Sequence, residues 1–433
     1  MNIKSLLARP FAAYISNSIR RDGENALNDQ NKIFHQLLKA GSATLFGKDH
    51  RFAAISNPTE FSQAVPVREY EQIRPYIEMI QEGKQNVLWR GKPIYFAKTS
   101  GTTSGVKYIP ITKDSVSHHI HSARNALLCF IAETGNNQFT NGKMIFLSGS
   151  PWMQMYFDRL LEKTGKTAAA LFPHLSVIVH GGVNFAPYRD RLFKTIGKEI
   201  ATIETYPASE GFIAFQDSQH EEGLWLNTNS GIFFEFIPAG EIFSDRPTRL
   251  TLGEVKLGEQ YVLIINSNAG LWGYNIGDTV KFVSLKPYRI VVTGRVKHFI
   301  SAFGEHVIGE EVEYSLLRAA AEQGLRITEF TVAPYIESGK GKSYHEWFIE
   351  FEQHPAQLDT LAEQIDRFLQ EKNIYYKDLI QGNILLPLRI RPVQKNGFIE
   401  YMKSQGKLGG QNKVPRLSND RTIASGMQKF VLR

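Results

Sequence analysis

Short apolar runs alternate with stretches of helical length between residues 93 and 206. This alternation is typical of an α/β layer, in which helices cover the faces of a sheet. The expected strands are Ile94–Ala97, Tyr108–Ile111, Met144–Leu147, Val177–His180 and Ile200–Thr205. The expected helices are Ala12–Leu38, Asp114–Ala132, Trp152–Lys163 and Tyr188–Ile196.

The pattern changes after Gly211, where several β-rich runs are separated by turn residues. Such runs predict an antiparallel sheet or a small barrel appended to the α/β core, over about residues 231–294. The runs are Gly231–Ile237, Tyr261–Ile265, Val280–Leu285 and Tyr288–Thr293.

Helices and strands alternate again beyond Gly294. The expected helices are Glu310–Gln323, Pro355–Lys372 with Pro355 in its first turn, and Gly397–Ser404. The expected strands are Glu329–Tyr335, Glu346–Glu352 and Leu385–Arg391. We therefore predict an N-terminal body over 1–294, a connection at 295–300 and an α+β unit over 301–433, which is close to the common size of a domain.

Composition narrows the class of protein. The 433 residues are 42% hydrophobic and 21% charged, as in an ordinary globular enzyme, and are too many for one core. The net charge of +7 is spread along the chain, and no basic stripe interleaved with aromatic residues favours a nucleic-acid partner. The single cysteine, Cys129, excludes an intrachain disulfide and lies in an apolar run typical of a buried, inert thiol. With no apolar stretch near eighteen residues and no secretory pattern, we expect a cytoplasmic protein without a membrane partner.

The segment between the first two expected strands concentrates glycines and hydroxyls, from Lys98 to Lys107. Glycines at 101 and 105 allow backbone N–H groups to approach an anion, and the Ser and Thr hydroxyls add donors. This composition predicts a phosphate-binding loop, although its spacing differs from that of a Walker A motif. A solvated turn is the alternative that composition alone leaves open.

Four later segments have a chemistry that would complete a nucleotide site, although each alone could be an ordinary turn or a surface arginine. Paired glycines after a strand would let backbone lie against a flat ring, and the next segment supplies an aromatic ring, a hydroxyl and a carboxylate that suits Mg²⁺. An aspartate behind a glycine turn can accept hydrogen bonds from a ribose diol, and a guanidinium can pair with phosphate. The segments are His180–Asn184, Glu204–Gly211, Gly273–Asp278 and Gly294–Val307.

In this order the segments resemble the adenylate-forming superfamily of luciferases and acyl-CoA synthetases. Within it the chain is most similar to the acyl-acid amido synthetases, typified by plant enzymes that conjugate auxin and jasmonate to amino acids, and we expect a bacterial member. The matching residues are Thr44–Gly47, Val65–Glu71, Thr99–Thr103, Tyr206–Gly211 and Gln411–Arg416. The implied fold is an α/β multidomain protein, with a large α/β body that includes a β-rich subdomain and a smaller α+β C-terminal lid.

The resemblance also implies chemistry. A carboxylic acid would attack MgATP to give an acyl-adenylate and pyrophosphate, and an amino acid or another amine would then displace AMP to give an amide. ATP and Mg²⁺ are thus the expected cofactors. By motif position, the phosphates would be held by Thr99, Ser100, Gly101, Thr102 and Thr103. The nucleotide would be contacted by Gly181, Gly182, Val183, Glu204, Tyr206, Ser209, Asp278 and Arg295. Glu210 would bind Mg²⁺, Lys297 would be the hinge and Lys413 would be the lysine at the α-phosphate.

Several alternatives stay open from sequence. Lys407 and Lys429 compete with Lys413, and coenzyme A competes with an amine as the acceptor. A non-catalytic AMP or acyl-adenylate binder would keep the same pocket. The identities of the acid and the amine, and the oligomeric state, do not follow from these motifs.

Two other patterns indicate no further chemistry. The histidines at 118 and 119 are successive on an expected helix and point about 100° apart, so they do not share a face. A serine-hydrolase elbow is not found around Ser148 or Ser150. The apolar residues Trp152, Met153 and Met155 would line the acid pocket or belong to the core.

Overall fold

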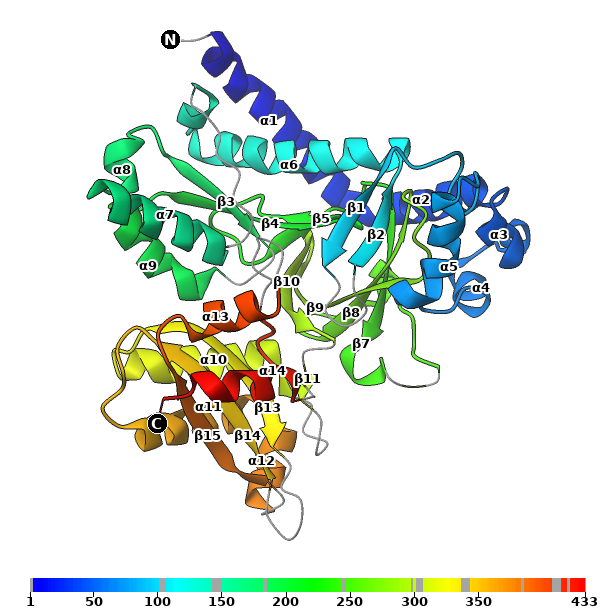
Figure 1. Cartoon of the computed structure of the whole chain (residues 1–433). Helices are drawn as coiled ribbons and strands as arrows, with labels where there is room; N and C mark the ends of the chain where they lie inside the picture. The colour runs from blue at the N-terminus through cyan, green and yellow to red at the C-terminus, as the bar shows by residue number, and fades with distance from the viewer. Residues whose placement is uncertain are drawn as a thin grey trace. The chain divides into compact units, whose positions relative to one another are not determined.

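In the computed structural model the chain divides into two compact units, Met1–Val292 and Thr293–Arg433 (Figure 1). The structure describes residues 3–100, 106–141, 150–181, 185–242, 244, 246–296, 299–300, 307–335, 343–382, 385–406, 414–418 and 421–432. Within these ranges no helix is long and apolar enough to cross a membrane.

An eight-stranded mixed sheet forms the centre of the first unit, in the order β3-β4-β5-β6-β10-β9-β8-β7. Its strands are β3 (Val177–Gly181), β4 (Ala201–Ala208), β5 (Gly211–Phe215), β6 (Leu224–Leu226), β7 (Ile232–Pro238), β8 (Gln260–Ser267), β9 (Tyr274–Leu285) and β10 (Tyr288–Arg295). β3 and β4 run parallel, whereas β5 pairs antiparallel with both β4 and β6.

The β-rich region predicted over 231–294 is found as strands β7 to β10, but these strands continue the sheet that begins with β3 instead of forming an appended sheet or barrel. The connection is made by β5 and β6, which sequence analysis missed. Both strands are buried at every position, so they lack the alternation of a half-exposed strand.

Helices cover both faces of the β3–β4 edge. Ile178 pairs with Thr202, one position before Ile203, so the two isoleucines point to opposite faces. Ile203 packs with Phe130 of α6, and Ile178 packs with α7 and α9. The helices of this unit are α1 (Ile3–Glu24), α2 (Ala26–Gly41), α3 (Leu45–Asp49), α4 (Pro58–Ala64), α5 (Tyr70–Gln81), α6 (Lys113–Thr134), α7 (Ser150–Thr164), α8 (Ala168–Leu171) and α9 (Ala186–Ile196). Its 3₁₀ helices are Phe52–Ala54, Gln138–Asn141, Ala239–Glu241 and Leu252–Glu254.

A two-stranded antiparallel hairpin, β1 (Tyr95–Ser100) and β2 (Val106–Ile111), precedes α6 (Figure 1). The backbone N–H of Tyr108 donates to the Tyr70 hydroxyl of α5 at 2.9 Å, which ties β2 to the rest of the unit. Thr112 then begins α6 by accepting from the backbone N–H of Ser115 at 3.1 Å, as an N-cap residue does.

The second unit has a three-stranded sheet in the order β13-β14-β15, with β13 and β14 antiparallel and β14 and β15 parallel. One face packs on α10 and α11, and the other on α13 and α14. The strands are β11 (Phe299–Ile300), β12 (Val307–Ile308), β13 (Ile327–Tyr335), β14 (Ser343–Phe351) and β15 (Leu385–Val393). The helices are α10 (Gly309–Glu322), α11 (Leu358–Lys372), α12 (Ile374–Gln381), α13 (Gly397–Ser404), α14 (Thr422–Met427) and a 3₁₀ helix, Gln428–Phe430.

The α/β multidomain class with an α+β C-terminal unit is confirmed by this architecture. One boundary is corrected: α11 begins at Leu358 with Gln357 as its N-cap, so Pro355 precedes the helix instead of occupying its first turn. Gln357 has extended backbone angles, φ −137° and ψ 93°, which end the loop there.

Candidate functional site

The predicted phosphate-binding segment falls on the β1–β2 hairpin. Thr99 pairs with Lys107 and Ser100 pairs with Val106, so the ladder holds both ends of the connection between the strands. The side chains of Thr99 and Ser100 lie outside the described residues, as does the connection with Gly101, Thr102 and Thr103.

Two predicted nucleotide-binding residues meet directly. The Tyr206 hydroxyl donates to Asp278 Oδ2 at 2.6 Å, across 72 residues of sequence. The two side chains belong to residues only 5% and 8% exposed. Tyr206 lies at a register shift between β4 and β5, and Asp278 follows Gly277, whose φ of +85° suits glycine. Because a carboxylate accepts at about four lone-pair sites, Asp278 can receive the tyrosine and a ribose diol together.

Glu210, the predicted magnesium ligand, lies in the turn between β4 and β5 beside Ser209. The Tyr274 hydroxyl at the start of β9 donates to Glu210 Oε1 in a long contact of 3.5 Å. Burial, and then the negative charge of Glu210, raises the pKa of Tyr274, so this phenol stays protonated and remains a donor.

The carboxylate of Glu210 suits Mg²⁺ as a single protein ligand. Carboxylate oxygen is a hard ligand, and protein-bound Mg²⁺ commonly takes one or two carboxylates together with substrate phosphates. Among the described residues no group of three His, Cys, Asp or Glu gathers as a complete metal site. Glu210 therefore fits an ion that arrives with a nucleotide.

The β3–β4 edge brings three more groups together. A Cβ at Gly181 would lie 2.0 Å from the carbonyl oxygen of Thr205, so the two strands approach closely enough to require glycine. Glu204 pairs with His180 across the strands, and burial raises the pKa of Glu204. His180 stacks on Phe185 with ring centroids 4.2 Å apart, and its buried Nδ1 has no hydrogen-bond partner among the described residues. Burial lowers the pKa of His180 to about 4, which keeps the imidazole neutral.

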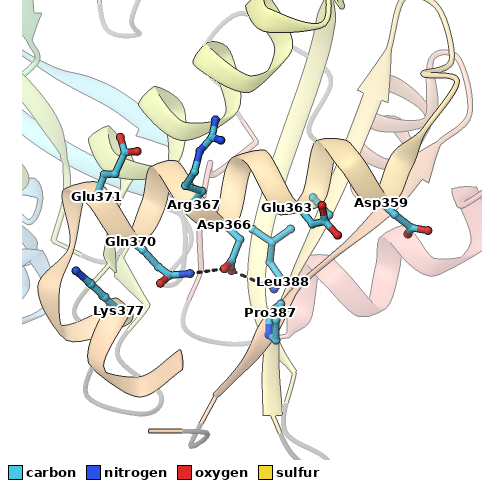
Figure 2. A pocket seen from close by; sticks show the side chains of 10 residues that line it. Asp359, Glu363, Asp366, Arg367, Gln370, Glu371, Lys377, Pro387 and Leu388 are labelled. Carbon is cyan, nitrogen blue, oxygen red and sulfur yellow. Dashed lines mark hydrogen bonds between the residues drawn. The ribbon is translucent and has the colours of Figure 1, made fainter. Parts of the chain in front are cut away.

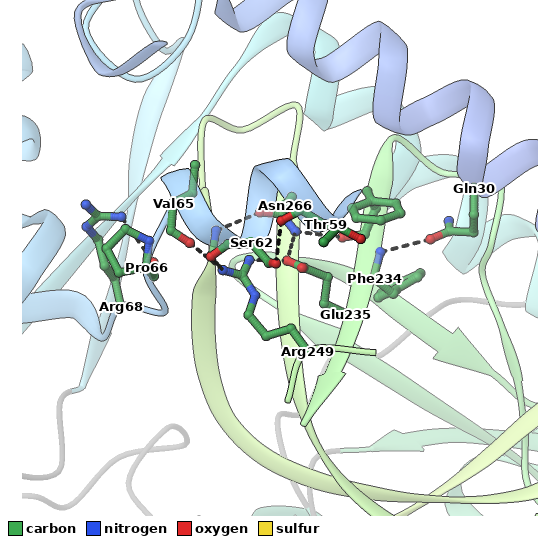
Figure 3. Close-up of polar contacts among 12 residues, drawn as sticks. Gln30, Thr59, Ser62, Val65, Pro66, Arg68, Phe234, Glu235, Arg249 and Asn266 are labelled. Carbon is green, nitrogen blue, oxygen red and sulfur yellow. Dashed lines mark hydrogen bonds and ion pairs between the residues drawn. The ribbon is translucent and has the colours of Figure 1, made fainter. Parts of the chain in front are cut away.

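A buried polar network fixes the start of β9, the strand that contains Asp278 (Figure 3). Arg249 forms an ion pair with Glu235 of β7, and Asn266 of β8 donates to Glu235 Oε2 at 2.8 Å. The Asn266 Oδ1 atom accepts from the backbone N–H of Gly273 at 2.6 Å, and the Gly273 carbonyl accepts from the backbone N–H of Arg68 at 2.8 Å. These bonds hold the chain immediately before Tyr274.

Lys413 lies outside the described residues, but the segment that follows it is firmly bound to β13. The backbone N–H of Val332 donates to the Arg416 carbonyl at 2.9 Å, and the Thr331 hydroxyl donates to the Pro415 carbonyl at 2.7 Å. The Arg416 guanidinium pairs with Glu313 at 3.3 Å and also with Glu329. The chain is therefore anchored within three residues of the predicted lysine.

Other predicted residues are placed only in part. Arg295 ends β10, but its side chain is outside the described residues. Lys429 lies in the 3₁₀ helix Gln428–Phe430, with Nζ 5.1 Å from the Phe430 ring centroid. Besides Gly101, Thr102, Thr103 and Lys413, the predicted residues and segments wholly outside the described ranges are Met144–Leu147, Gly182, Val183, Lys297 and Lys407.

Three further features considered from sequence can be located. Cys129 of α6 is buried in the apolar cluster that also contains Ile19 and Ile203. Burial raises the pKa of its thiol to about 12, so the thiol is inert. Met153 is buried with Phe157 and Ile178, whereas the side chains of Trp152 and Met155 are not described. His121 is exposed on α6, where His118 and His119 are half-buried.

A separate hollow of about 570 Å³ lies along α11 in the second unit (Figure 2). Its lining includes Glu363, Arg367 and Lys377, and it contains none of the predicted site residues. Asp366 at its base already accepts from the Tyr376 hydroxyl at 2.6 Å and from Gln370 at 2.6 Å. The predicted chemistry therefore does not coincide with this hollow.

Sequence analysis missed the contact of Tyr274 with Glu210 and the unpartnered, buried ring nitrogen of His180. Tyr274 stands inside the segment already considered, four residues before Asp278, but only the sheet brings it to Glu210. His180 was visible as the polar end of an apolar strand, but the lack of a partner for its ring is a property of the packing.

Comparison with known proteins covers the length of both units. The model of the GH3 family N-terminal domain matches residues 15–155, that of the central domain matches 225–295, and that of the C-terminal domain matches 310–422. The fold is similar to the solved structure of AtGH3.15 acyl acid amido synthetase in complex with 2,4-DB, with a TM-score of 0.77, 15% identity and 96% of each chain covered. A 2-hydroxyisobutyryl-CoA ligase has a TM-score of 0.53 at 11% identity, with 96% of this chain and 91% of that chain covered.

The sequence matches to curated relatives cover only part of this chain and a smaller part of each relative. Indole-3-acetic acid-amido synthetase GH3.3 of Arabidopsis thaliana is 26% identical over 199 residues, which are 42% of this chain and 33% of the plant protein. Jasmonoyl--L-amino acid synthetase JAR6 of Nicotiana attenuata is 26% identical over 198 residues, with the same shares. The GH3 domain-containing protein of Homo sapiens is 26% identical over 202 residues, 45% of this chain and 38% of that protein. The match thus spans well under half of these relatives, and plant and human sources give no support to the expected bacterial one. The three domain models together cover most of the chain, and the protein belongs to the GH3 family.

Proposed function

We propose that this protein is an ATP-dependent, AMP-forming ligase that joins a carboxylic acid to an amino acid through an amide bond. A carboxylate oxygen attacks the α-phosphorus of ATP, the bond to the β-phosphate oxygen breaks, and pyrophosphate leaves. The amine nitrogen then attacks the acyl carbon, loses a proton and displaces AMP. The GH3 membership and the fold support this assignment.

The observation that supports it most directly is the buried hydrogen bond between Tyr206 and Asp278. These residues were assigned to the adenine and the ribose on separate motifs. Their contact at 2.6 Å makes one preorganised surface from two distant segments. A ring held by a carboxylate loses little freedom when it stacks on a base, so the contact favours nucleotide binding.

The remaining residues would act around the phosphates and the base. The hydroxyls from Thr99 to Thr103 donate to phosphate oxygens, and Gly181 and Gly182 let backbone approach the adenine opposite Tyr206. Lys413 places positive charge where negative charge develops at the α-phosphate, an effect worth roughly a few kcal/mol. Arg295 assists at the ribose, and Lys297 is the hinge about which the C-terminal unit rotates between half-reactions.

Glu210 would hold Mg²⁺, with Tyr274 orienting its carboxylate. When bound, the ion neutralises phosphate charge and orients the leaving pyrophosphate. ATP use also agrees with a cytoplasmic enzyme.

The assignment is tested by incubating the purified protein with MgATP and a panel of carboxylic acids, and trapping acyl-adenylates with hydroxylamine. At least one acid should release pyrophosphate well above the rate without acid. Pyrophosphate release at background for every acid would contradict adenylation.

Thioester formation with coenzyme A is the second candidate, and the fold similarity to a CoA ligase keeps it in the test. Only the true acceptor should accelerate AMP release from a preformed adenylate. Amino acids and coenzyme A are therefore compared at equal concentrations, and acceleration by coenzyme A alone would replace the amide assignment.

A non-catalytic adenylate binder is distinguished by Lys413→Ala. In an enzyme this change should reduce the rate of adenylation far more than it reduces AMP affinity. Equal losses in both would mark Lys413 as a binding group. Lys429→Ala is the matched control, because Lys429 is the competing late lysine whose position the structure describes, in the 3₁₀ helix Gln428–Phe430.

A further inference from the structure

One face of the C-terminal sheet is only partly covered by helices (Figure 1). At one end of this face, Phe348 and Val393 pack against Phe398 of α13 and Met427 of α14. The other end presents a polar and aromatic set of side chains from three strands, in paired register. These are Tyr335 on β13, Tyr344 and Glu346 on β14, and Arg389 and Arg391 on β15.

The aromatic part of this set is a stack with guanidinium groups over it. Tyr335 and Tyr344 have ring centroids 4.7 Å apart and planes 20° from parallel. The Arg389 guanidinium lies 4.2 Å from the Tyr344 centroid, and that of Arg421, at the start of α14, lies 4.8 Å from the Tyr335 centroid. Stacking on a ring fixes the orientation of a guanidinium while leaving its edge open to an anion.

The charges of this set do not balance. Glu346 is completely buried and accepts from Arg391 Nε at 2.7 Å and from an Arg421 Nη atom at 2.6 Å. Arg389 is exposed and forms no ion pair within the described part of the chain. The set thus contains three guanidinium groups and one carboxylate, and only Arg391 and Arg421 bond to that carboxylate. The formal excess on this patch is two positive charges.

We propose that Arg389 and Arg391 form a binding site for a phosphate group on the C-terminal unit. Residues two apart on a strand share a face and have Cα atoms about 7 Å apart, so both guanidinium groups can reach one tetrahedral anion. Each has five N–H donors in a planar fork, and Arg391 uses Nε for Glu346 and also hydrogen-bonds the Tyr344 side chain, which leaves further donors for an anion. The dianion of phosphate matches the two excess charges, whereas a carboxylate would match one.

The buried Glu346 makes this a built site and not a chance pair of surface arginines. It holds Arg391 from beneath the sheet face, and Gln428 also donates to it at 3.4 Å. The Arg391 side chain is nevertheless 39% exposed. The carboxylate therefore positions the guanidinium while leaving it accessible. This inference does not depend on the proposed ligase activity.

Titration of the full chain with inorganic phosphate tests the proposal by calorimetry. Arg389→Gln and Arg391→Gln should each weaken phosphate binding about tenfold or more, because charge-assisted hydrogen bonds are the strong ones. Arg326→Gln is the matched control, since Arg326 is an exposed arginine of this unit, at 53%, but pairs with Glu352. Its phosphate affinity should equal that of the unchanged protein.

Competition with acetate identifies the class of ligand, and a spectroscopic control excludes unfolding. Acetate that competes as well as phosphate would overturn the phosphate assignment. The site would be refuted if both arginine variants bind phosphate as tightly as the unchanged protein does. It would also be refuted if the unchanged protein shows no measurable phosphate binding. Arg389 makes no hydrogen bond within the described residues, so Arg389→Gln should keep the circular dichroism spectrum and separate binding from folding.

Discussion

Replacing Tyr206 by phenylalanine removes one oxygen and leaves the ring that is proposed to stack on adenine. The lost bond joins two buried residues, with 2.6 Å between the Tyr206 hydroxyl and Asp278 Oδ2. A hydrogen bond to a charged group contributes about 1.5–3 kcal/mol, and the buried carboxylate would lose a donor that water at this depth does not fully replace. The change should therefore disturb the ribose side of the site and leave the ring contact.

Since 1.4 kcal/mol is a factor of ten, the KM for ATP should rise about 10- to 150-fold in Tyr206→Phe. The kcat at saturating ATP should change much less, because neither residue is assigned to the reacting phosphates. Pyrophosphate release against ATP concentration measures both constants. Tyr14→Phe is the control, because Tyr14 is 65% exposed and should leave both unchanged.

A double-mutant cycle with Asp278→Asn tests whether the two side chains act as one unit. Neighbours that share a bond show coupling of about 0.5–3 kcal/mol, so the double variant should be less impaired than the sum of the single effects. Strict additivity, or a KM unchanged in Tyr206→Phe, would refute the reasoning that this contact prepares the nucleotide site.

Three further changes probe the framework around the site. Gly181→Ala places a Cβ 2.0 Å from a backbone oxygen of β4. The change should weaken AMP binding, measured by fluorescence titration, and lower the unfolding midpoint. Gly240→Ala is the control, because the space around Gly240 is open, and it should change neither quantity. Arg249→Met leaves Glu235 buried without its ion-pair partner and should cost about 3–5 kcal/mol of unfolding free energy in urea; a loss below 1 kcal/mol would contradict the importance of the pair. Burial lowers the pKa of His180 from 6.5, its value in the unfolded chain, to about 4, so the folded state favours the neutral ring. About 3 kcal/mol of folding stability should therefore be lost as the pH falls from about 6.5 to about 4. Thermal unfolding of the His180→Phe variant should depend less on pH over that window, and an identical dependence would show that His180 is not the group responsible.

Local pattern predicted the elements whose faces differ in polarity. The helix Gly397–Ser404 is found with the predicted bounds, and β3 begins at the predicted Val177. The pattern failed at β5, where all five residues are buried and no alternation distinguishes a strand from a buried turn of helix. That failure hid the continuity of the sheet, which rests on pairing between distant segments and not on any local property.

The same distinction applies to the site. Motif spacing selected Tyr206, Glu210 and Asp278 because their side chains suit a base, a metal ion and a diol. It could not indicate that Tyr206 bonds to Asp278 or that Tyr274 faces Glu210, because these contacts depend on strand order and on bulges. Residue type selected the candidate groups, whereas the contacts between them came only from the fold.

In both units, the segments proposed to contain reactive residues are held by hydrogen bonds close to those residues. The hydroxyl-rich connection begins and ends on the hydrogen-bonded ladder of β1 and β2. Lys413 is followed by Val414–Ser418, which bonds to β13 through backbone atoms, and Arg416 of this segment pairs with Glu329 of β13 and with Glu313 of α10. A segment fixed so close to the residues proposed to bind phosphate would lose less conformational entropy on binding it. The groups proposed to recognise the nucleotide, Tyr206 and Asp278, lie on the sheet itself, where a buried network sets the start of β9. We infer that recognition depends on the rigidity of the sheet and that catalysis depends on short connections with fixed ends, so substitutions in the two sets should separate into KM and kcat effects.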